Sequence, residues 1–123
     1  MPKLVKFWQR SQLTHKPKKF DPSLEISPSS WSFLCWFGSK YKHAADVIYA
    51  CEKAVALVPN DGEILDSRGI ARALTGNTKG AIEDFQAFIA WTSNPKDKSK
   101  RQHWVNTLRT GRNPFTDKEI QSL

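Results

Sequence analysis

Apolar residues recur at intervals of three and four along most of this chain. In one such stretch, Ala44, Val47, Ile48, Cys51 and Ala54 follow one another at this spacing. On an α-helix the spacing brings apolar side chains to one face, which can then pack against a neighbouring element. No run alternates apolar and polar residues between hairpin turns. The pattern therefore predicts an all-α protein.

Turn-forming residues divide this pattern into separate helices. We expect helices over residues 30–37, 43–57, 63–74, 79–91 and 98–109, with Thr116 capping a short last one. The breaks fall at Gly38, at residues 59–62, 75–77 and 94–95, and at Gly111. Because the connections are short, successive helices are expected to be antiparallel neighbours.

The N-terminal part differs in character from the rest. Residues 1–28 contain four of the seven prolines, and we interpret them as a basic arm with one short helix over residues 4–13. Residues 29–123 then form a single helical domain. No apolar run approaches the ~20 residues of a membrane-spanning helix, even at the aromatic-rich stretch WSFLCWFG, residues 31–38. The first residues lack the apolar core and cleavage site of a secretory signal, which favours a cytoplasmic location.

Charge is unevenly distributed along the chain, which has 123 residues and a net charge of +7. Residues 1–20 hold six basic and no acidic side chains, and residues 21–95 hold six basic and nine acidic ones. Residues 96–123 hold seven basic and three acidic side chains. Two basic ends thus flank a mildly acidic middle. Such ends favour an anionic partner of any kind: an acidic protein face, nucleic acid or lipid head groups.

The helical pattern repeats at an offset of 34 residues. At this offset Trp31 aligns with Leu65, Trp36 with Ile70, and Ile70 in turn with Trp104. The helix that contains Trp104 thus continues the repeat, and helical arrays commonly end in such a capping helix. The sequence thus predicts a short α-α superhelical array of two helical hairpins plus a C-terminal capping helix.

These motif residues resemble the tetratricopeptide repeat, a helix–turn–helix unit of about 34 residues. The residues that match its pattern are Trp31, Leu34, Ala54 and Pro59 in one unit, and Gly69, Gly76, Ala81 and Phe85 in the next. The stretch DSRGIARALTGNTKGAIEDFQAFIAW, residues 66–91, is also similar to C-terminal helical-repeat segments of bacterial, especially cyanobacterial, multidomain signalling proteins. The resemblance implies a protein-interaction module.

In the resembled fold, the first helix of each unit lines a concave groove. The groove positions of this chain are then Trp36, Lys40, Glu63, Asp66, Ile70, Leu74, Lys100 and Trp104. Aromatic anchors with a few orienting charges suit a bound peptide or protein surface. Two intramolecular covers stay open as alternatives: the arm, through Phe7 and Trp8, or the C-terminal Phe115 and Ile120.

The sequence contains no recognisable set of catalytic or metal-binding residues. Cys35, His43 and Cys51 are only three zinc-ligand candidates, and their spacing is not that of a structural site. We expect two buried thiols, although a disulfide between facing sides of one hairpin is conceivable. Glu83 and Asp84 point about 100° apart on a helix, and the glycine motifs of nucleotide binding are absent. We therefore expect no enzyme, no metal and no cofactor.

The sequence thus predicts a non-catalytic adaptor, or a subunit of a larger complex, that binds a peptide or protein surface through its groove. The arm would contact an acidic partner through Lys3, Lys6, Phe7, Trp8, Arg10, Lys16, Lys18 and Lys19. The alternative is a small basic nucleic-acid-associated protein. In that case bases would stack on the arm's rings or on Trp104 while cations contact phosphates.

Overall fold

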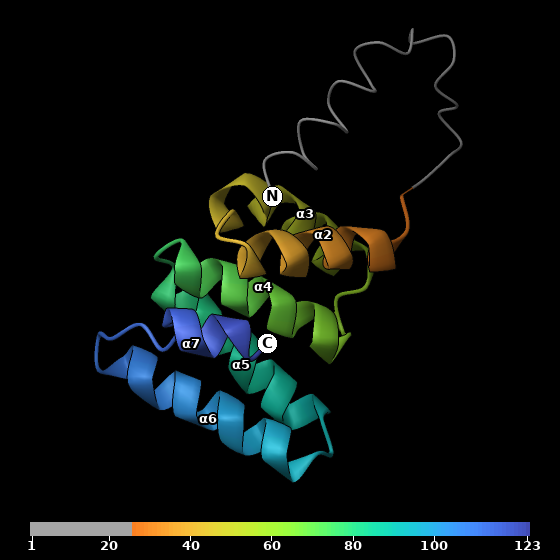
Figure 1. The fold of residues 1–123 in the computed structure, drawn as a ribbon. Coiled ribbons are helices and arrows are strands. Elements are labelled where there is room, and N and C mark those ends of the chain that lie inside the picture. The colour runs from red at the N-terminus through yellow and green to blue at the C-terminus, as the bar shows by residue number, and fades with distance from the viewer. Residues whose placement is uncertain (1–25) are drawn as a thin grey trace, which may run out of the picture.

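The computed structural model describes residues 26–123, and within this range every regular element is a helix (Figure 1). The helices are α2 (Pro28–Lys40), α3 (Ala44–Leu57), α4 (Gly62–Leu74), α5 (Thr78–Trp91), α6 (Pro95–Arg109) and α7 (Asp117–Gln121). The predicted all-α fold is confirmed. The arm helix expected over residues 4–13 lies outside the described residues.

Polar side chains set where most of these helices begin. Asp61 accepts hydrogen bonds from the first-turn amides of Glu63 and Ile64 in α4. Asn77, Asn94 and Thr116 accept in the same way at the starts of α5, α6 and α7. Each cap satisfies backbone donors that have no partner within the helix. The predicted cap at Thr116 is confirmed.

Gly38 does not end a helix, contrary to the prediction, because α2 continues to Lys40. Gly38 is buried against α3, and an added Cβ would lie 2.5 Å from Val47 Cγ1. The missing side chain therefore allows the two helices to approach closely. By contrast, the predicted break at Gly111 is confirmed, since this residue follows α6 with a φ of +82°.

The start of α6 also differs from the prediction. The helix begins at Pro95, three residues earlier than expected. Asn94 caps it, and proline suits the first turn because its missing N–H would have had no helical partner there. A proline that the sequence marked as a break is therefore a helix start.

The helices pack as consecutive neighbours. α2 packs on α3, α3 on α4, α4 on α5 and α5 on α6, and α2 also contacts α4. Figure 1 shows the resulting array, with α2 and α3 at one end and α6 at the other. The predicted helical array is thereby confirmed, and the short last helix expected after Thr116 is α7.

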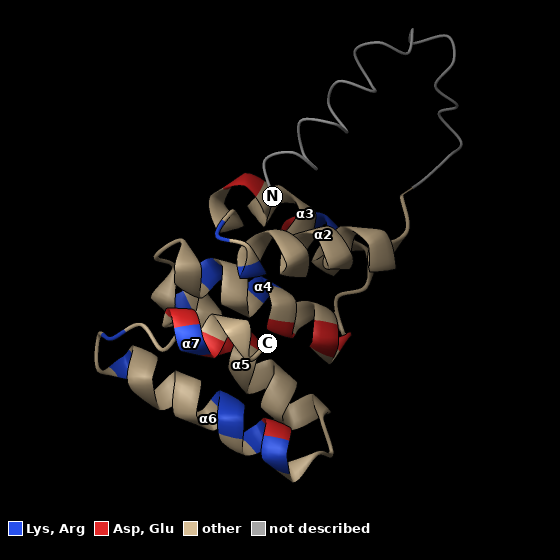
Figure 2. Cartoon of the chain, in the orientation of Figure 1, with Lys and Arg blue, Asp and Glu red and all other residues tan. Residues whose placement is uncertain are grey.

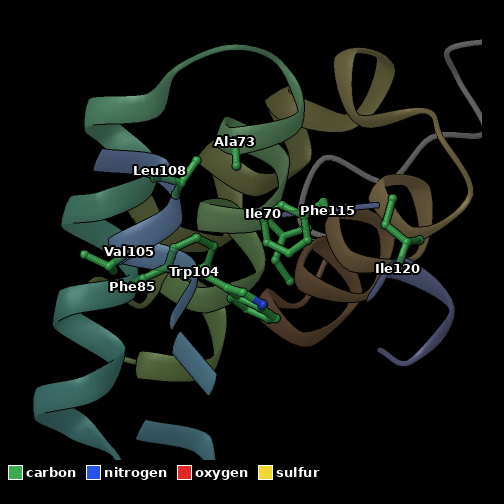
Figure 3. Packing of buried hydrophobic residues seen from close by; sticks show 9 residues of the cluster. Ile70, Ala73, Phe85, Trp104, Val105, Leu108, Phe115 and Ile120 are labelled. Carbon is green, nitrogen blue, oxygen red and sulfur yellow. The ribbon is translucent and has the colours of Figure 1, made fainter. Parts of the chain in front are cut away.

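The main hydrophobic core lies between α4, α5, α6 and the C-terminal segment (Figure 3). Its buried members are Ile70, Ala73, Ala81, Phe85, Trp104, Val105, Leu108, Phe115 and Ile120. A smaller cluster joins α2, α3 and α4 through Cys35, Ala44, Cys51 and Ala71. Leu74 packs against both clusters. The α2–α3 end of the array therefore has the thinner core.

Cys35 of α2 and Cys51 of α3 form a disulfide. The expectation of two separate buried thiols is therefore wrong. Both cysteines are buried, and their Cα atoms lie 4.9 Å apart. The close approach of α2 and α3 at Gly38 brings the facing positions of the hairpin within reach of each other.

A network of ion pairs joins α3, α4 and α5. Arg68 donates to both carboxylate oxygens of Asp84, at 2.9 and 2.8 Å, and contacts Glu52 at 3.3 Å. Arg72 lies 3.4 Å from both of these acids. Asp84 is buried, so the two guanidinium groups compensate a charge that would otherwise be costly to desolvate. Asp84 is thus a structural residue.

Candidate functional site

Three aromatic rings line the outward side of α2. Phe33, Phe37 and Tyr41 are four residues apart, which places them one turn above another. Ring centroids are 5.3 Å apart for Phe33 and Phe37, and 4.6 Å apart for Phe37 and Tyr41. Phe33 is 57% exposed and Tyr41 is 49% exposed. We call these three residues the aromatic strip. It is a candidate binding site, because contiguous exposed apolar surface commonly marks an interaction site.

An open pocket of about 340 Å³ adjoins the aromatic strip between α2 and the start of α4. Phe33, Trp36 and Ile64 supply its apolar walls, together with three serines, and Asp61 and Glu63 supply two carboxylates. Within residues 26–123, neither carboxylate has an ion-pair partner. The pocket thus combines aromatic walls with two carboxylates, of which Asp61 also caps α4.

The C-terminal part of the predicted groove is filled by the chain itself. Ile70 and Trp104 are 2% and 0% exposed. The ring of Phe115 lies 4.8 Å from that of Trp104, and Trp104 Nε1 donates to Glu119 Oε1 at 3.0 Å (Figure 3). Ile120 belongs to the same cluster. Ile70 and Trp104 are therefore core residues and do not line an open groove, because the C-terminal segment covers them.

Asp66, another predicted groove residue, is buried in an ion pair with Arg101. Arg101 donates to its two carboxylate oxygens at 3.0 and 2.6 Å. The guanidinium also lies 4.6 Å from the ring centroid of Phe88 and 4.7 Å from that of Trp104. Burial raises the pKa of the Asp66 carboxyl above its ordinary value, although the hydrogen bonds from Arg101 act in the opposite direction. This pair fixes α6 against α4 and is not open to a ligand.

The structure thus separates the predicted groove residues into two groups. Trp36 and Glu63 line the open pocket, and Lys40 Nζ lies 5.0 Å from the Trp36 ring centroid. The residues that belong to the interior are Asp66, Ile70 and Trp104, whereas Leu74 is half-buried at the edge of the main core. Lys100 flanks this interior, 3.7 Å from Glu119 and 5.7 Å from the Trp104 ring centroid. The predicted arm residues, 3 to 19, lie outside the described part of the chain.

Sequence reasoning missed the aromatic strip as a site. Its signal was present in the regular spacing of Phe33, Phe37 and Tyr41. The expected helix ended before Gly38, however, and this bound left Tyr41 in a loop. Once Gly38 is understood as a contact between helices, Phe33 and Phe37 share one face of α2, and Tyr41 follows as its C-cap residue.

Several basic residues lie along α6 (Figure 2). Lys96, Lys98 and Arg109 are exposed and can contact an anion. Trp104 is buried, however, and Arg101 is held by Asp66. α6 therefore offers positive charge to a nucleic acid, but its tryptophan is not available for base stacking.

Comparisons of the chain with protein-family models, with curated proteins and with solved structures find no match. In the described part of the chain, no helix has the length and apolar character needed to cross a membrane. Residues 26–123 also contain no group of three His, Cys, Asp or Glu side chains placed to hold a metal ion. The function is therefore inferred from the geometry of the surface.

Proposed function

We propose that this protein is a non-catalytic interaction module that binds another protein through the aromatic strip of α2. The observation that carries the proposal is the row of three neighbouring rings along α2 and its C-cap, of which Phe33 and Tyr41 are exposed. Exposed apolar surface is unfavourable in water by roughly 25 cal/mol per Å², and a bound partner removes it from water. Large aromatic residues are also the side chains that most often dominate binding energy at protein interfaces.

The surface fits an amphipathic helix with an acidic flank. Such a helix presents apolar side chains at intervals of three and four, which matches rings one turn apart on α2. Lys40 and Lys42 lie at the C-terminal end of the aromatic strip, and the exposed Lys42 also forms an exposed ion pair with Asp117 at 3.2 Å. Residues 1–20 add six basic side chains and no acidic one. These cations complement carboxylates on the partner, which favours its orientation and rate of association.

The double variant Phe33→Ala/Phe37→Ala tests this proposal. Proteins captured from the native host by the wild type, by this variant and by Tyr49→Ala are compared by quantitative mass spectrometry. Tyr49 is the matched control, because it is an exposed aromatic residue on α3. A partner lost only from the double variant is then purified and titrated. We expect its affinity to fall by about 2 kcal/mol or more, with unchanged helicity. Equal capture by all three proteins would refute the proposal.

The repeat family and the cellular location belong to the same proposal. The 34-residue offset and the consecutive helical array support a tetratricopeptide-type repeat of the kind found in bacterial signalling proteins. The disulfide weighs against the cytoplasmic location predicted from the sequence, since disulfides rarely persist in a reducing compartment. Alkylation of Cys35 and Cys51 in protein taken from its host decides between a reducing and an oxidising compartment. Free thiols support the cytoplasm, and blocked thiols support an oxidising compartment.

Nucleic-acid binding is the second candidate, supported by the exposed lysines of α6 and by the basic arm. Titration with non-specific DNA and RNA at increasing salt separates it from protein binding. Micromolar binding that weakens steeply with salt would favour this candidate, because phosphate contacts release counterions. No binding at low salt would eliminate it.

A further inference from the structure

The C-terminal segment covers Ile70 and Trp104, whereas Phe33 and Tyr41 of the aromatic strip are exposed in the described part of the chain. We propose that the basic arm of the same chain, residues 3–19, docks on the aromatic strip and the adjoining pocket. The docked arm covers this surface until a partner displaces it. The displacement rests on the proposed function, whereas the docking does not.

The described chain begins beside this surface. Ser29, in the first turn of α2, lines the pocket. The ten residues that separate position 19 from position 29 span up to ~33 Å when extended. α2 has 13 residues, which corresponds to a length of ~20 Å. The arm therefore has enough length to return along α2 from its N-terminal end to its C-terminal end.

The arm contains aromatic side chains that can complete the exposed strip. Phe7 and Trp8 are adjacent in the sequence, and Leu4 precedes Trp8 by four residues. Aromatic rings pack favourably on other rings in offset or edge-to-face arrangements. Phe33 is exposed, and the half-buried Phe37 lies against it, with the ring centroids 5.3 Å apart. Docking would bury apolar surface on both sides.

Charge favours the arm over an acidic segment at the pocket. The pocket lining includes Asp61 and Glu63 and no basic side chain among the described residues. The arm has six basic residues and no acid over residues 1–20. Trp36 adds a ring whose face attracts cations, as its contact with Lys40 shows. The pocket therefore suits a lysine or arginine of the arm.

The same chemistry explains how an acidic partner would release the arm. The apolar face of the partner competes with Phe7 and Trp8 for the aromatic strip. Its carboxylates compete with Asp61 and Glu63 for the arm's cations. A neutral apolar helix would compete only for the aromatic strip, so the arm makes binding selective for acidic partners.

Hydroxyl-radical footprinting of the full chain tests the docking, because the oxidation rate of each ring reports its solvent exposure. We expect Phe33 and Phe37 to be oxidised several-fold more slowly in the wild type than in the variant Phe7→Ala/Trp8→Ala. Tyr49, which is exposed on α3, is the internal control and should react at the same rate in both proteins. Equal rates for Phe33 and Phe37 in the two proteins would overturn the docking.

A second pair of variants tests the electrostatic part. Glu63→Gln is expected to lose much of the protection of Phe33, whereas Glu83→Gln, at an exposed site on α5, should keep it. Loss of protection in both variants or in neither would show that the pocket carboxylate does not hold the arm. Protection that disappears on dilution would mean that a second copy covers the strip, which contradicts docking within one chain.

The two proposals can fail separately. If partner capture depends on Phe33 and Phe37 but footprinting shows no protection by the arm, the proposed function stands and the docking is refuted. If the arm protects Phe33 and Phe37 but no partner depends on the aromatic strip, the docking stands and the proposed function is refuted. Where both hold, Phe7→Ala/Trp8→Ala should bind the partner several-fold more tightly than the wild type, and weaker binding would contradict displacement.

Discussion

Trp36 and Trp104 occupy equivalent positions in the 34-residue repeat but have different environments. Trp36 lies half-buried at the edge of an open pocket. Trp104 is enclosed by Phe85 and Phe115, and its indole N–H is satisfied by Glu119. Their equivalent positions in the repeat were visible in the sequence. Whether a later segment covers each ring depends on tertiary packing, and the spacing of the repeat does not contain that information.

Trp104→Ala is expected to lower the free energy of unfolding by about 3–5 kcal/mol, because it removes the largest side chain of the main core and leaves a cavity. Trp36→Ala should cost far less, since its ring is already partly in water. Urea denaturation of both variants measures the difference. Similar losses would show that the two tryptophans share one environment and would contradict the structure.

Asp66 makes the stability of the fold depend on pH. Burial raises the pKa of its carboxyl above 3.8 in the folded protein, so the folded state binds a proton more readily than the unfolded state. The contribution of Asp66 to the free energy of unfolding therefore falls as the pH rises through the folded pKa. Arg101 lowers this pKa, whereas Asp97 and Glu63 raise it.

We expect the free energy of unfolding of the wild type, taken relative to Asp66→Asn, to decline from about pH 4 upward. It should become constant once Asp66 is ionised in both states. Urea denaturation of the two proteins over a pH series gives this difference directly. A difference that increases with pH would mean that pairing with Arg101 outweighs burial.

At the scale of elements, α2 has fewer buried residues than α3, α4 or α5. Its buried residues are only Cys35, Gly38 and Ser39, and its aromatic strip faces solvent. The disulfide to α3 and the close contact at Gly38 therefore matter more here than equivalent contacts would in α4 or α5. A helix that keeps apolar side chains available for a partner cannot also bury them in its own core.

Reduction of the Cys35–Cys51 disulfide is expected to destabilise the protein by about 3 kcal/mol, the value for a closed loop of this length, since the cysteines are 16 positions apart. Denaturation with and without reductant measures this, and hydrogen exchange should locate the loss in α2. The variant Cys35→Ala/Cys51→Ala is the control and should not respond to reductant. An unchanged midpoint for the wild type would show that the disulfide contributes nothing.

At the scale of the whole molecule, the sequence predicted the bounds of the helices better than the tertiary contacts between them. Helix periodicity and turn residues are local signals, so α3, α4 and α5 were found within one residue of their observed bounds. Gly38 and Pro95 were misread because each has two structural uses, and only packing or capping selects between them. The candidate site depended on which surfaces the C-terminal segment covers. That cover is a contact between distant parts of the chain, and local patterns do not specify it.

The disulfide also determines what proteolysis in the turn between α2 and α3 would do to the protein. The turn between α2 and α3 lies between the two cysteines, and Lys42 in this turn has a side chain that is 70% exposed. A trypsin-like protease that cuts after Lys42 would break the backbone but leave the two fragments joined through sulfur. The arm and the aromatic strip would then stay attached to the array until a reductant arrives. Proteolysis followed by reduction would release α2, together with the aromatic strip, as a separate peptide.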